Sequence, residues 1–199
     1  NCPDYGVPQH RKRLVLLASR FGEIHLIPPL YDAEHYITVR DAIGHLQPIE
    51  AGEICPNDIL HRSSALSAIN MERIQQSVPG GTWRDWDESL RLKCHRKESG
   101  ATFPSVYGRM EWDEPSPTMT TQFYGYGNGR FGHPEQNRAI SLREGAILQS
   151  FPDDYIFIDD LHPAKKRELG THIGNAVPVE LGRAIGMSIQ QHLTEMGVN

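Results

Sequence analysis

The chain has 199 residues, of which 38% are hydrophobic and 23% are charged, values typical of a soluble globular protein with one large or two small domains. No apolar run approaches the roughly 20 residues of a membrane span, and the N-terminus lacks the basic and apolar stretches of a signal peptide. The formal charge of −5 excludes a uniformly basic nucleic-acid binder, although local basic patches remain compatible with it.

The first half of the chain is predicted to contain one strand and two helices. The apolar run over residues 13–18 favours a strand that is buried, as in a parallel sheet. Residues 38–43 are expected to start a helix, for which Thr38 is a suitable N-cap. Residues 47–62 contain Pro, Gly, Asn and Asp and are expected to form a loop. Apolar residues at helical spacing predict an amphipathic helix over residues 64–78, which a Pro-Gly-Gly sequence ends.

The middle of the chain is predicted to be rich in loops and strands. Residues 82–102 are charged and irregular, and strand-like segments follow over residues 106–112 and 118–123. The Asn128-Gly129 pair is typical of a two-residue hairpin turn.

Helices dominate the C-terminal third. Ser141 followed three residues later by Glu144 predicts a capping box, which opens a helix through residue 149. Residues 163–169 are expected to form a short helix. Pro178 suits the first turn of a long terminal helix. The predicted buried stripe of that helix consists of Val179, Leu181, Ile185, Ile189 and Leu193.

Cys2, Cys55 and Cys94 are an odd number of widely spaced cysteines without a Cys-x-x-Cys pair. They predict free thiols in a reducing cytoplasm rather than disulfides or zinc ligands. The ten His residues show no ligand spacing, and the Asp153-Asp154 and Asp159-Asp160 pairs are more typical of solvated turns, so no metal is expected. The chain lacks an initiator Met, which suggests a piece of something longer.

Three stretches resemble, in the same order, motifs from the C-terminal part of the cytosine-C5 DNA methyltransferases. Residues 4–13 are similar to the eighth motif, Tyr-Gly-x-Pro-Gln-x-Arg-x-Arg, residues 138–155 to the ninth, and residues 174–178 to the tenth. Residues 108–112, 117–118 and 133–138 also resemble the stretch that precedes the ninth motif. Three motifs in the family order make the resemblance specific, and it weakens between about residues 45 and 100.

The resemblance implies an α+β fragment, in which end segments of a Rossmann-like α/β methyltransferase domain bracket a loop- and strand-rich target-recognition domain. Residues 1–45 would end the catalytic domain, residues 46–172 would form the target-recognition domain with the ninth motif, and residues 173–199 would return to the catalytic domain. The family's Gly-rich S-adenosylmethionine motif, Pro-Cys nucleophile and Glu-Asn-Val triplet do not occur in the sequence. The chain alone is therefore expected to be inactive, and to expose apolar surface on the 13–18 strand and the terminal helix.

The eighth motif carries the residues expected at the target base. Methylation of C5 requires a cytosine that is flipped out of the duplex, attacked by a thiolate and gripped at O2 by a fixed cation. The resemblance implies that Arg13 reaches O2, that Arg11 supports it or binds an adjacent phosphate, and that Gln9 lines the same edge or contacts the DNA backbone. From spacing alone, two arginines beside a buried strand would more often be surface cations in salt bridges.

The tenth motif carries the residues expected at the cofactor. The resemblance implies that Asn175, Ala176 and Val177 border the S-adenosylmethionine pocket once the missing sheet is present, where an Asn amide can both donate and accept hydrogen bonds. Without the resemblance, Gly-Asn before Pro178 would be a turn and a helix start.

Double-stranded DNA is the expected partner, together with the missing catalytic half on the same or a second chain. Residues 1–20 carry four Lys or Arg against one Asp, and residues 61–100 carry seven against five acids, so these segments should meet the phosphates. Side chains on projecting loops should read the bases. The candidate DNA contacts are Arg84, Arg96, Lys97, Thr118, Gln122, Tyr126, Asn128 and Arg130. Each of them singly could equally be a solvated loop residue.

The sequence thus predicts the DNA-recognition part of a bacterial DNA (cytosine-5-)-methyltransferase, cytoplasmic and nucleoid-associated, from a restriction-modification system. Two alternatives remain. The chain could be the recognition subunit of a split methyltransferase, which would co-purify with a chain carrying the Pro-Cys half. It could also be a non-catalytic, sequence-selective DNA-binding module, which would bind duplex DNA in a salt-sensitive way without a partner.

Overall fold

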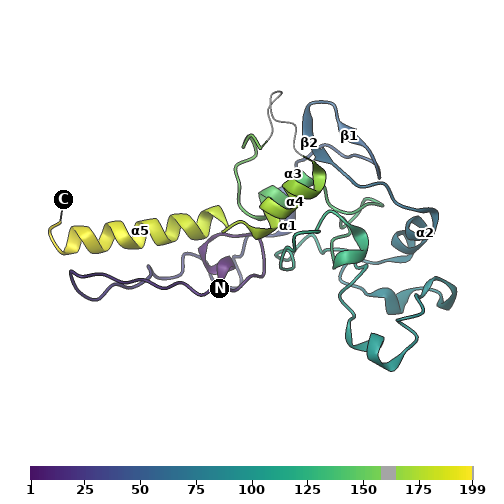
Figure 1. Cartoon of the computed structure of the whole chain (residues 1–199), viewed down its shortest axis with the longest axis horizontal. Coiled ribbons are helices and arrows are strands. Elements are labelled where there is room, and N and C mark those ends of the chain that lie inside the picture. Colours follow the sequence, from purple (N-terminus) through teal and green to yellow (C-terminus); the bar gives the residue numbers. More distant parts are fainter. Residues whose placement is uncertain (158–164, 199) are drawn as a thin grey trace.

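Helices and short turns carry most of the regular structure in the computed structural model, which describes residues 1–157 and 165–198 (Figure 1). A single two-stranded antiparallel hairpin is the only sheet in these described residues. The helices and strands are α1 (Val39–Ile43), β1 (Ile54–Cys55), β2 (Asp58–Arg62), α2 (Ala68–Gln76), α3 (Leu142–Leu148), α4 (Lys166–Asn175) and α5 (Val179–Glu195). Short 3-10 turns lie at Cys2–Tyr5, Trp83–Asp85, Glu88–Leu90, Glu98–Thr102 and Tyr126–Asn128.

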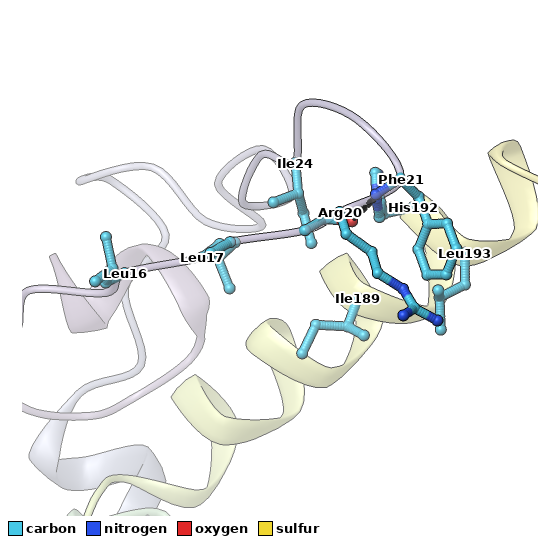
Figure 2. A pocket seen from close by; sticks show the side chains of 10 residues that line it. Leu16, Leu17, Arg20, Phe21, Ile24, Ile189, His192 and Leu193 are labelled. Atoms are coloured by element: carbon cyan, nitrogen blue, oxygen red, sulfur yellow. Dashed lines mark hydrogen bonds between the residues drawn. The ribbon is translucent and has the colours of Figure 1, made fainter.

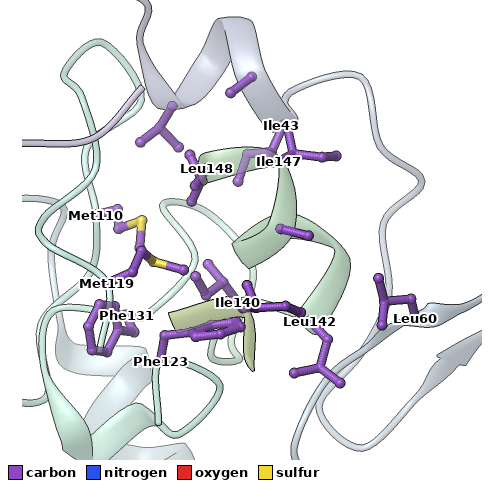
Figure 3. Packing of buried hydrophobic residues seen from close by; sticks show 14 of the residues in the cluster. Ile43, Leu60, Met110, Met119, Phe123, Phe131, Ile140, Leu142, Ile147 and Leu148 are labelled. Atoms are coloured by element: carbon purple, nitrogen blue, oxygen red, sulfur yellow. The ribbon is translucent and has the colours of Figure 1, made fainter. Parts of the chain in front are cut away.

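The main hydrophobic core surrounds α3, whose residues are all buried (Figure 3). Helices α1 and α4 and strand β2 pack around α3. Met119, Phe123 and Phe131, which come from irregular segments, complete the core. A helix enclosed on every side must be apolar, or its polar groups must have hydrogen-bond partners. The charged residues of α3 therefore need such partners.

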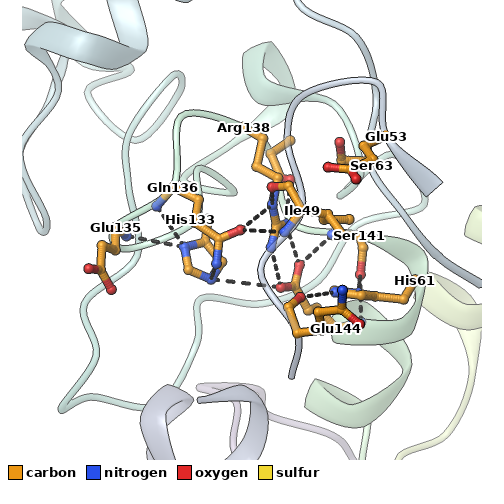
Figure 4. A network of polar contacts seen from close by, with 12 residues as sticks. Ile49, Glu53, His61, Ser63, His133, Glu135, Gln136, Arg138, Ser141 and Glu144 are labelled. Atoms are coloured by element: carbon orange, nitrogen blue, oxygen red, sulfur yellow. Dashed lines mark hydrogen bonds and ion pairs between the residues drawn. The ribbon is translucent and has the colours of Figure 1, made fainter. Parts of the chain in front are cut away.

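The carboxylate of Glu144 on α3 is buried and fully hydrogen-bonded (Figure 4). Arg138 donates one bond of 2.7 Å to each oxygen, and the Ser141 N–H donates a third at 2.6 Å. The Ser141 hydroxyl accepts the Glu144 N–H, so the predicted capping box is confirmed. Burial alone would raise the pKa of Glu144, but the hydrogen bonds and charge of Arg138 lower it to about 2. The pair therefore stays ionised inside the core.

His133 lies beside this pair (Figure 4). Its Nδ1 accepts the N–H groups of Glu135 and Gln136 at 3.1 and 2.9 Å, and its Nε2 lies 3.7 Å from Oε1 of Glu144. Burial lowers the pKa of His133 to about 4 in spite of the neighbouring carboxylate, so the ring is neutral near pH 7.

A second cluster joins α2 to residues 82–107, the segment that we call the aromatic lobe. Arg109 is buried at the junction and donates hydrogen bonds of 2.8 Å to the Ile74 and Ser77 carbonyls, at the C-terminal end of α2. It also donates to the His133 and Gln136 carbonyls at 2.8 and 2.7 Å. This guanidinium therefore caps α2 and fastens the lobe to the main core.

Residues 13–28 and α5 form an arm that projects from the body of the molecule (Figure 1). Helix α5 buries Leu181, Ala184, Ser188 and His192, which follow a spacing of three and four residues. The predicted stripe is corrected at Val179 and Ile189, which are exposed because the packed face of the helix is rotated away from them.

The predicted strand over residues 13–18 is wrong for this structure. The side chains alternate as in a strand, and Leu14 and Leu16 are 96% and 89% exposed, whereas Val15 packs beside Leu181. No backbone-to-backbone hydrogen bond involves residues 12–28 within the described chain. A strand needs a neighbour that pairs with it, and none of the described segments lies there to do so.

The outer end of the arm has a cavity of about 410 Å³ between its two parts (Figure 2). Leu16, Leu17 and Ile24 lie on one side of it, and Ile189 and Leu193 of α5 lie on the other. The expected exposure of apolar surface on both elements is therefore present.

The predicted helices over residues 38–43, 64–78 and 141–149 are confirmed as α1, α2 and α3, with α2 shorter at both ends. The short helix predicted for residues 163–169 is α4, which extends through Asn175 and takes in the Gly-Asn pair expected to precede the terminal helix. Its predicted first residues, 163 and 164, lie outside the described residues, as does the Asp159-Asp160 pair.

Other predicted loops and strands are corrected. Residues 47–62 contain the β1–β2 hairpin rather than a loop. Residues 106–112 and 118–123 form no strands, because within the described chain the first segment has only isolated bridges, such as Arg109 with Gly132, and the second has none. Asn128 ends a 3-10 turn instead of turning a hairpin.

Replacing Glu144 by Gln should lower the free energy of unfolding by about 3–5 kcal/mol, because the Arg138 guanidinium would stay buried without its counter-charge. Equilibrium chemical denaturation measures the difference. E135Q is the matched control, since this side chain is exposed, and it should change stability by less than about 0.5 kcal/mol. An E144Q protein as stable as the E135Q protein would contradict the interpretation.

Stability should also fall as the pH drops from about 6.5 towards 4. The unfolded His133 takes up a proton near its ordinary pKa of 6.5, whereas the folded ring resists protonation down to about 4. Glu144 should cause a second loss of stability between about pH 4.5 and 2, since its pKa in the folded protein, about 2, is lower than its ordinary pKa of 4.5.

The variant H133N should remove the first of these losses, because the Asn oxygen can still accept a backbone N–H but cannot be protonated. The free energy of unfolding, measured near pH 7 and near pH 4, should therefore fall less in H133N than in the wild type. Equal falls in both proteins would show that His133 does not control this range.

Candidate functional site

The side-chain amide of Gln9 joins segments that lie far apart in the sequence. Gln9 is fully buried, and its Nε2 donates to the Leu148 carbonyl and to Oε1 of Gln149, both at 3.1 Å. Its Oε1 accepts the Met119 N–H at 2.8 Å and one N–H of Arg11 at 3.2 Å. Both ends of the amide are therefore occupied inside the protein.

Gln149 extends this network to the end of α4. Its Nε2 donates to the Ile173 and Gly174 carbonyls at 2.9 and 3.2 Å. Gly174 is required at this position, because a Cβ on it would lie 2.4 Å from the carbonyl oxygen of Thr120. The network thus holds the segments resembling the eighth, ninth and tenth motifs against one another.

Arg11 is only 4% exposed, and none of the described carboxylates pairs with it. It donates to the Met119 and Gly174 carbonyls at 3.0 and 3.3 Å, in addition to Gln9. Burial lowers the pKa of Arg11, and the positive charge of Arg13 adds to the effect. An enclosed guanidinium cannot reach a phosphate, so the structure favours the supporting role over the phosphate contact.

Arg13, two residues after Arg11, is exposed. It donates a 2.8 Å hydrogen bond to the Lys12 carbonyl, and it has no acidic partner among the described residues. It lines an open cavity of about 260 Å³ together with Leu16, Val177 and Leu181. One residue predicted at the target base and one predicted at the cofactor therefore share a groove.

Asn175, Ala176 and Val177 link α4 to α5. Asn175 is exposed at the end of α4, Val177 is 63% exposed, and the Ala176 N–H donates to the Ile173 carbonyl at 3.2 Å. The groove offers an apolar wall against which a nucleoside could pack. No Asp or Glu lines it within the described chain, so a carboxylate that binds the ribose hydroxyls would have to come from another part of the enzyme. The residues fit one side of a cofactor pocket.

The segment from Thr118 to Gln122 presents a row of polar side chains. Thr118 and Thr120 are exposed while Met119 between them is buried, as expected of extended backbone, and Gln122 is exposed in the turn that follows. Thr118 and Thr120 line a cavity of about 360 Å³ with Asn128 and Arg130, which we call the polar hollow; the apolar Val106, Pro117 and Phe131 also form part of its wall. Three of the predicted DNA contacts therefore converge on one feature.

Arg84, Arg96 and Lys97 are on the aromatic lobe and do not line the polar hollow. All three are exposed. The guanidinium of Arg84 lies over the Trp83 ring at 5.6 Å, and Arg96 donates to the Glu88 carbonyl at 2.8 Å. Exposed Asp85, Asp87 and Glu88 lie on the same segment, so the cations alternate with acids there.

The structure corrects two predicted DNA contacts, Gln9 and Tyr126, which are 0% and 2% exposed. The Tyr126 hydroxyl shares a 2.6 Å hydrogen bond with Ser77, and burial raises the pKa of Tyr126 to about 12. Sequence reasoning missed Thr120, although the period of two from Thr118 pointed to it.

Neither a metal site nor a membrane span is found in the described chain. Its His, Cys, Asp and Glu side chains form no group of three or more that could hold an ion. Its helices are all too short or too polar to cross a bilayer.

Comparison with known proteins gives consistent matches over nearly the whole chain. Residues 1–191 match the profile of the family described as C-5 cytosine-specific DNA methylase. The type II methylase M.HgiDII of Herpetosiphon aurantiacus is 56% identical over 193 residues, which cover 97% of this chain and 54% of the relative. The type II methyltransferase M1.HphI of Haemophilus parahaemolyticus is 36% identical over 191 residues, covering 95% and 46%. The chain thus spans about half the length of these relatives.

A solved structure supports the same fold. It is an Escherichia coli prophage-encoded protein described as a DNA modification methyltransferase, and it superimposes with a TM-score of 0.62 at 20% sequence identity. The match covers 97% of this chain and 58% of the other. At this identity, the likeness establishes the fold.

Replacing Gln9 by Ala should lower the free energy of unfolding by about 2–4 kcal/mol, because the Met119 N–H and the Leu148 carbonyl would lose a buried partner. Chemical denaturation measures the change. Q122A is the matched control, since Gln122 is exposed, and it should stay within about 0.5 kcal/mol of the wild type. Equal stability of the two variants would contradict the proposed role of the Gln9 network in holding these segments together.

Proposed function

The chain belongs to the C-5 cytosine-specific DNA methylase family, and from this premise we propose that it is the DNA-recognition part of an S-adenosylmethionine-dependent DNA (cytosine-5-)-methyltransferase. The enzyme would methylate C5 of a flipped cytosine in a specific duplex site. The observation that carries the proposal is the shared groove of Arg13 and Val177, held in place by the buried Gln9 network.

Arg13 is proposed to contact O2 of the target cytosine. Attack at C6 places negative charge on the ring, and a fixed cation at O2 offsets it. A guanidinium suits this task because it never deprotonates and presents a planar set of donors. Arg13 is exposed and two residues from the buried Arg11, whose bonds to Met119 and Gly174 fix the loop that carries it.

Asn175, Ala176 and Val177 are proposed to border S-adenosylmethionine, which supplies the methyl group when bound. Val177 would contact an apolar part of the cofactor, and the exposed Asn175 amide would hydrogen-bond to a polar part. The groove lined by Arg13 and Val177 would form only one wall of the cofactor pocket, so we assign the other walls to another part of the enzyme.

No cysteine is among the described residues that line the groove of Arg13, and the exposed Cys94 lies on the aromatic lobe. Cys2 is 1% exposed, and burial raises the pKa of its thiol, which disfavours the thiolate. We therefore propose that the chain is inactive alone and that a catalytic half, on the same or a second polypeptide, supplies the nucleophile. A split methyltransferase would use the same surfaces.

The arm is proposed as the surface that meets this catalytic half. Residues 12–28 have no backbone pairing within the described chain, and Leu14 and Leu16 project into solvent. Exposed apolar side chains on unpaired extended backbone favour addition to another sheet. On this basis, residues 1–45 and 173–199 belong to the catalytic domain, which is Rossmann-like, and residues 46–172 form the target-recognition domain.

Mixing the chain with the portion of M.HgiDII that it does not match should restore methyl transfer from labelled S-adenosylmethionine to duplex DNA. R13A should reduce that transfer by about 100-fold or more, because a donor at the charged ring is lost. K12A is the matched control, since it removes the neighbouring exposed cation, and it should change the rate by less than about threefold if the contact is specific to Arg13. A rate with R13A equal to that with K12A would overturn the assignment of Arg13.

A further inference from the structure

Residues 91–103 of the aromatic lobe, which we call the basic segment, are held in place by side chains. The segment carries Arg91, Lys93, Arg96 and Lys97. Its backbone-to-backbone hydrogen bonds join positions three apart, so none of them ties it to a distant part of the described chain. The Trp83 indole donates to the Phe103 carbonyl at 3.0 Å, and the side chain of Leu92 is partly buried.

His95 is the only buried residue of the basic segment among those whose exposure is described. Its ring stacks on the Trp83 ring at 4.2 Å, with an angle of 15° between the planes. The Tyr107 ring meets it edge-on at 6.1 Å, and the Trp86 ring lies at 6.3 Å. The imidazole therefore inserts among the aromatic side chains of the lobe and is the main attachment of the segment.

The surroundings of His95 favour its neutral form. The Nδ1 atom is buried and has no hydrogen-bond partner within the described chain. The charges that act on the ring are those of Arg73 on α2 and of Arg91, and both are positive. Tyr107 is the other titratable side chain in contact with the ring. Burial, followed by these two positive charges, lowers the pKa of His95.

The aromatic faces around His95 already hold other cations. The Arg73 guanidinium lies 5.6 Å from the centres of both the Trp86 and Tyr107 rings. The Arg84 guanidinium lies over the Trp83 ring, also at 5.6 Å. An imidazolium in the stack would add a further positive charge to rings whose attraction for cations is already in use. Protonation should therefore expel the ring rather than strengthen the stack.

We propose that the neutral ring of His95 holds the basic segment on the aromatic lobe, and that uptake of a proton by this ring releases the segment. The device goes beyond the proposed function, since it requires neither DNA nor a catalytic half. Arg96 and Lys97 occupy the two positions that follow the ring, so release would displace both of these cations from their places on the lobe.

Release is favoured by acid. The released ring takes up a proton at its ordinary pKa of 6.5, whereas the pKa of the seated ring is lower. The proton therefore binds more tightly to the released form, and the balance moves toward release as the pH falls below about 6.5.

The test is an NMR titration of the isotope-labelled full chain from about pH 7.5 to about pH 5, a range that brackets the ordinary pKa of histidine. The heteronuclear NOE of the amides in the basic segment reports their fast motion. These values should fall as His95 takes up a proton, and the indole N–H signals of Trp83 and Trp86 should shift in the same step. Trp112 is an internal control, because its ring contacts His133 instead of the lobe.

The variant H95F keeps an aromatic ring in the stack but cannot be protonated, so its basic segment should stay ordered over the whole range. H172F is the matched control, since His172 is an exposed histidine on α4, and it should titrate as the wild type does. R91Q leaves the ring in place and removes one of the two positive charges, so the midpoint should rise by about 0.5 pH units.

A basic segment that stays ordered while His95 is protonated would overturn the proposal. Equal loosening of the segment in H95F and in the wild type would do the same, as would an unchanged midpoint in R91Q.

Discussion

The buried amide of Gln9 is the contact on which the geometry of the site depends. It cannot be enclosed without partners, and the partners come from residues about 110 and 140 positions away in the chain. Arg11 and Gln149 carry the same network to the end of α4. Arg13, Thr118 and Val177 each lie within a few residues of these bonds, so their relative positions follow from satisfying buried polar groups.

Four arginine side chains are buried in the described residues, and they are held in two different ways. Arg143 pairs with Asp58 at 2.6 Å. Arg138 is neutralised by Glu144 and stabilises the main core. Arg11 and Arg109 are instead held mainly by backbone carbonyls, and their burial lowers the pKa of both. Carbonyl groups accept hydrogen bonds from these guanidiniums without cancelling their charge, and the buried Nε of Arg11 has no partner within the described chain. Arg11 therefore adds positive potential next to Arg13, at the point where the proposed chemistry develops negative charge.

The sequence was most informative where a structural cause is local. Thr38 and Ser141 form their capping boxes with a residue three positions on, so the starts of α1 and α3 were predictable. The 13–18 strand depends on a neighbour that the described chain lacks. The 106–112 segment likewise forms only isolated bridges, and the 118–123 segment forms none. The burial of Gln9 and Tyr126 was not predictable either, because their partners lie elsewhere in the chain. Exposed Arg13 and Val177 were found through motif resemblance rather than through spacing.

The most direct test of the account is amide hydrogen exchange over residues 12–28, with and without the portion of M.HgiDII that the chain does not match. Apart from the Ile27 N–H, which donates to the buried Ser188 hydroxyl at 2.9 Å, these amides have no backbone partner within the described chain and should exchange rapidly when the chain is alone. If the arm completes a sheet in a catalytic half, alternate amides from Leu14 onward should become strongly protected in the mixture, while α3 remains unchanged. Equally fast exchange in both samples would contradict the claim that the chain is one part of a larger methyltransferase.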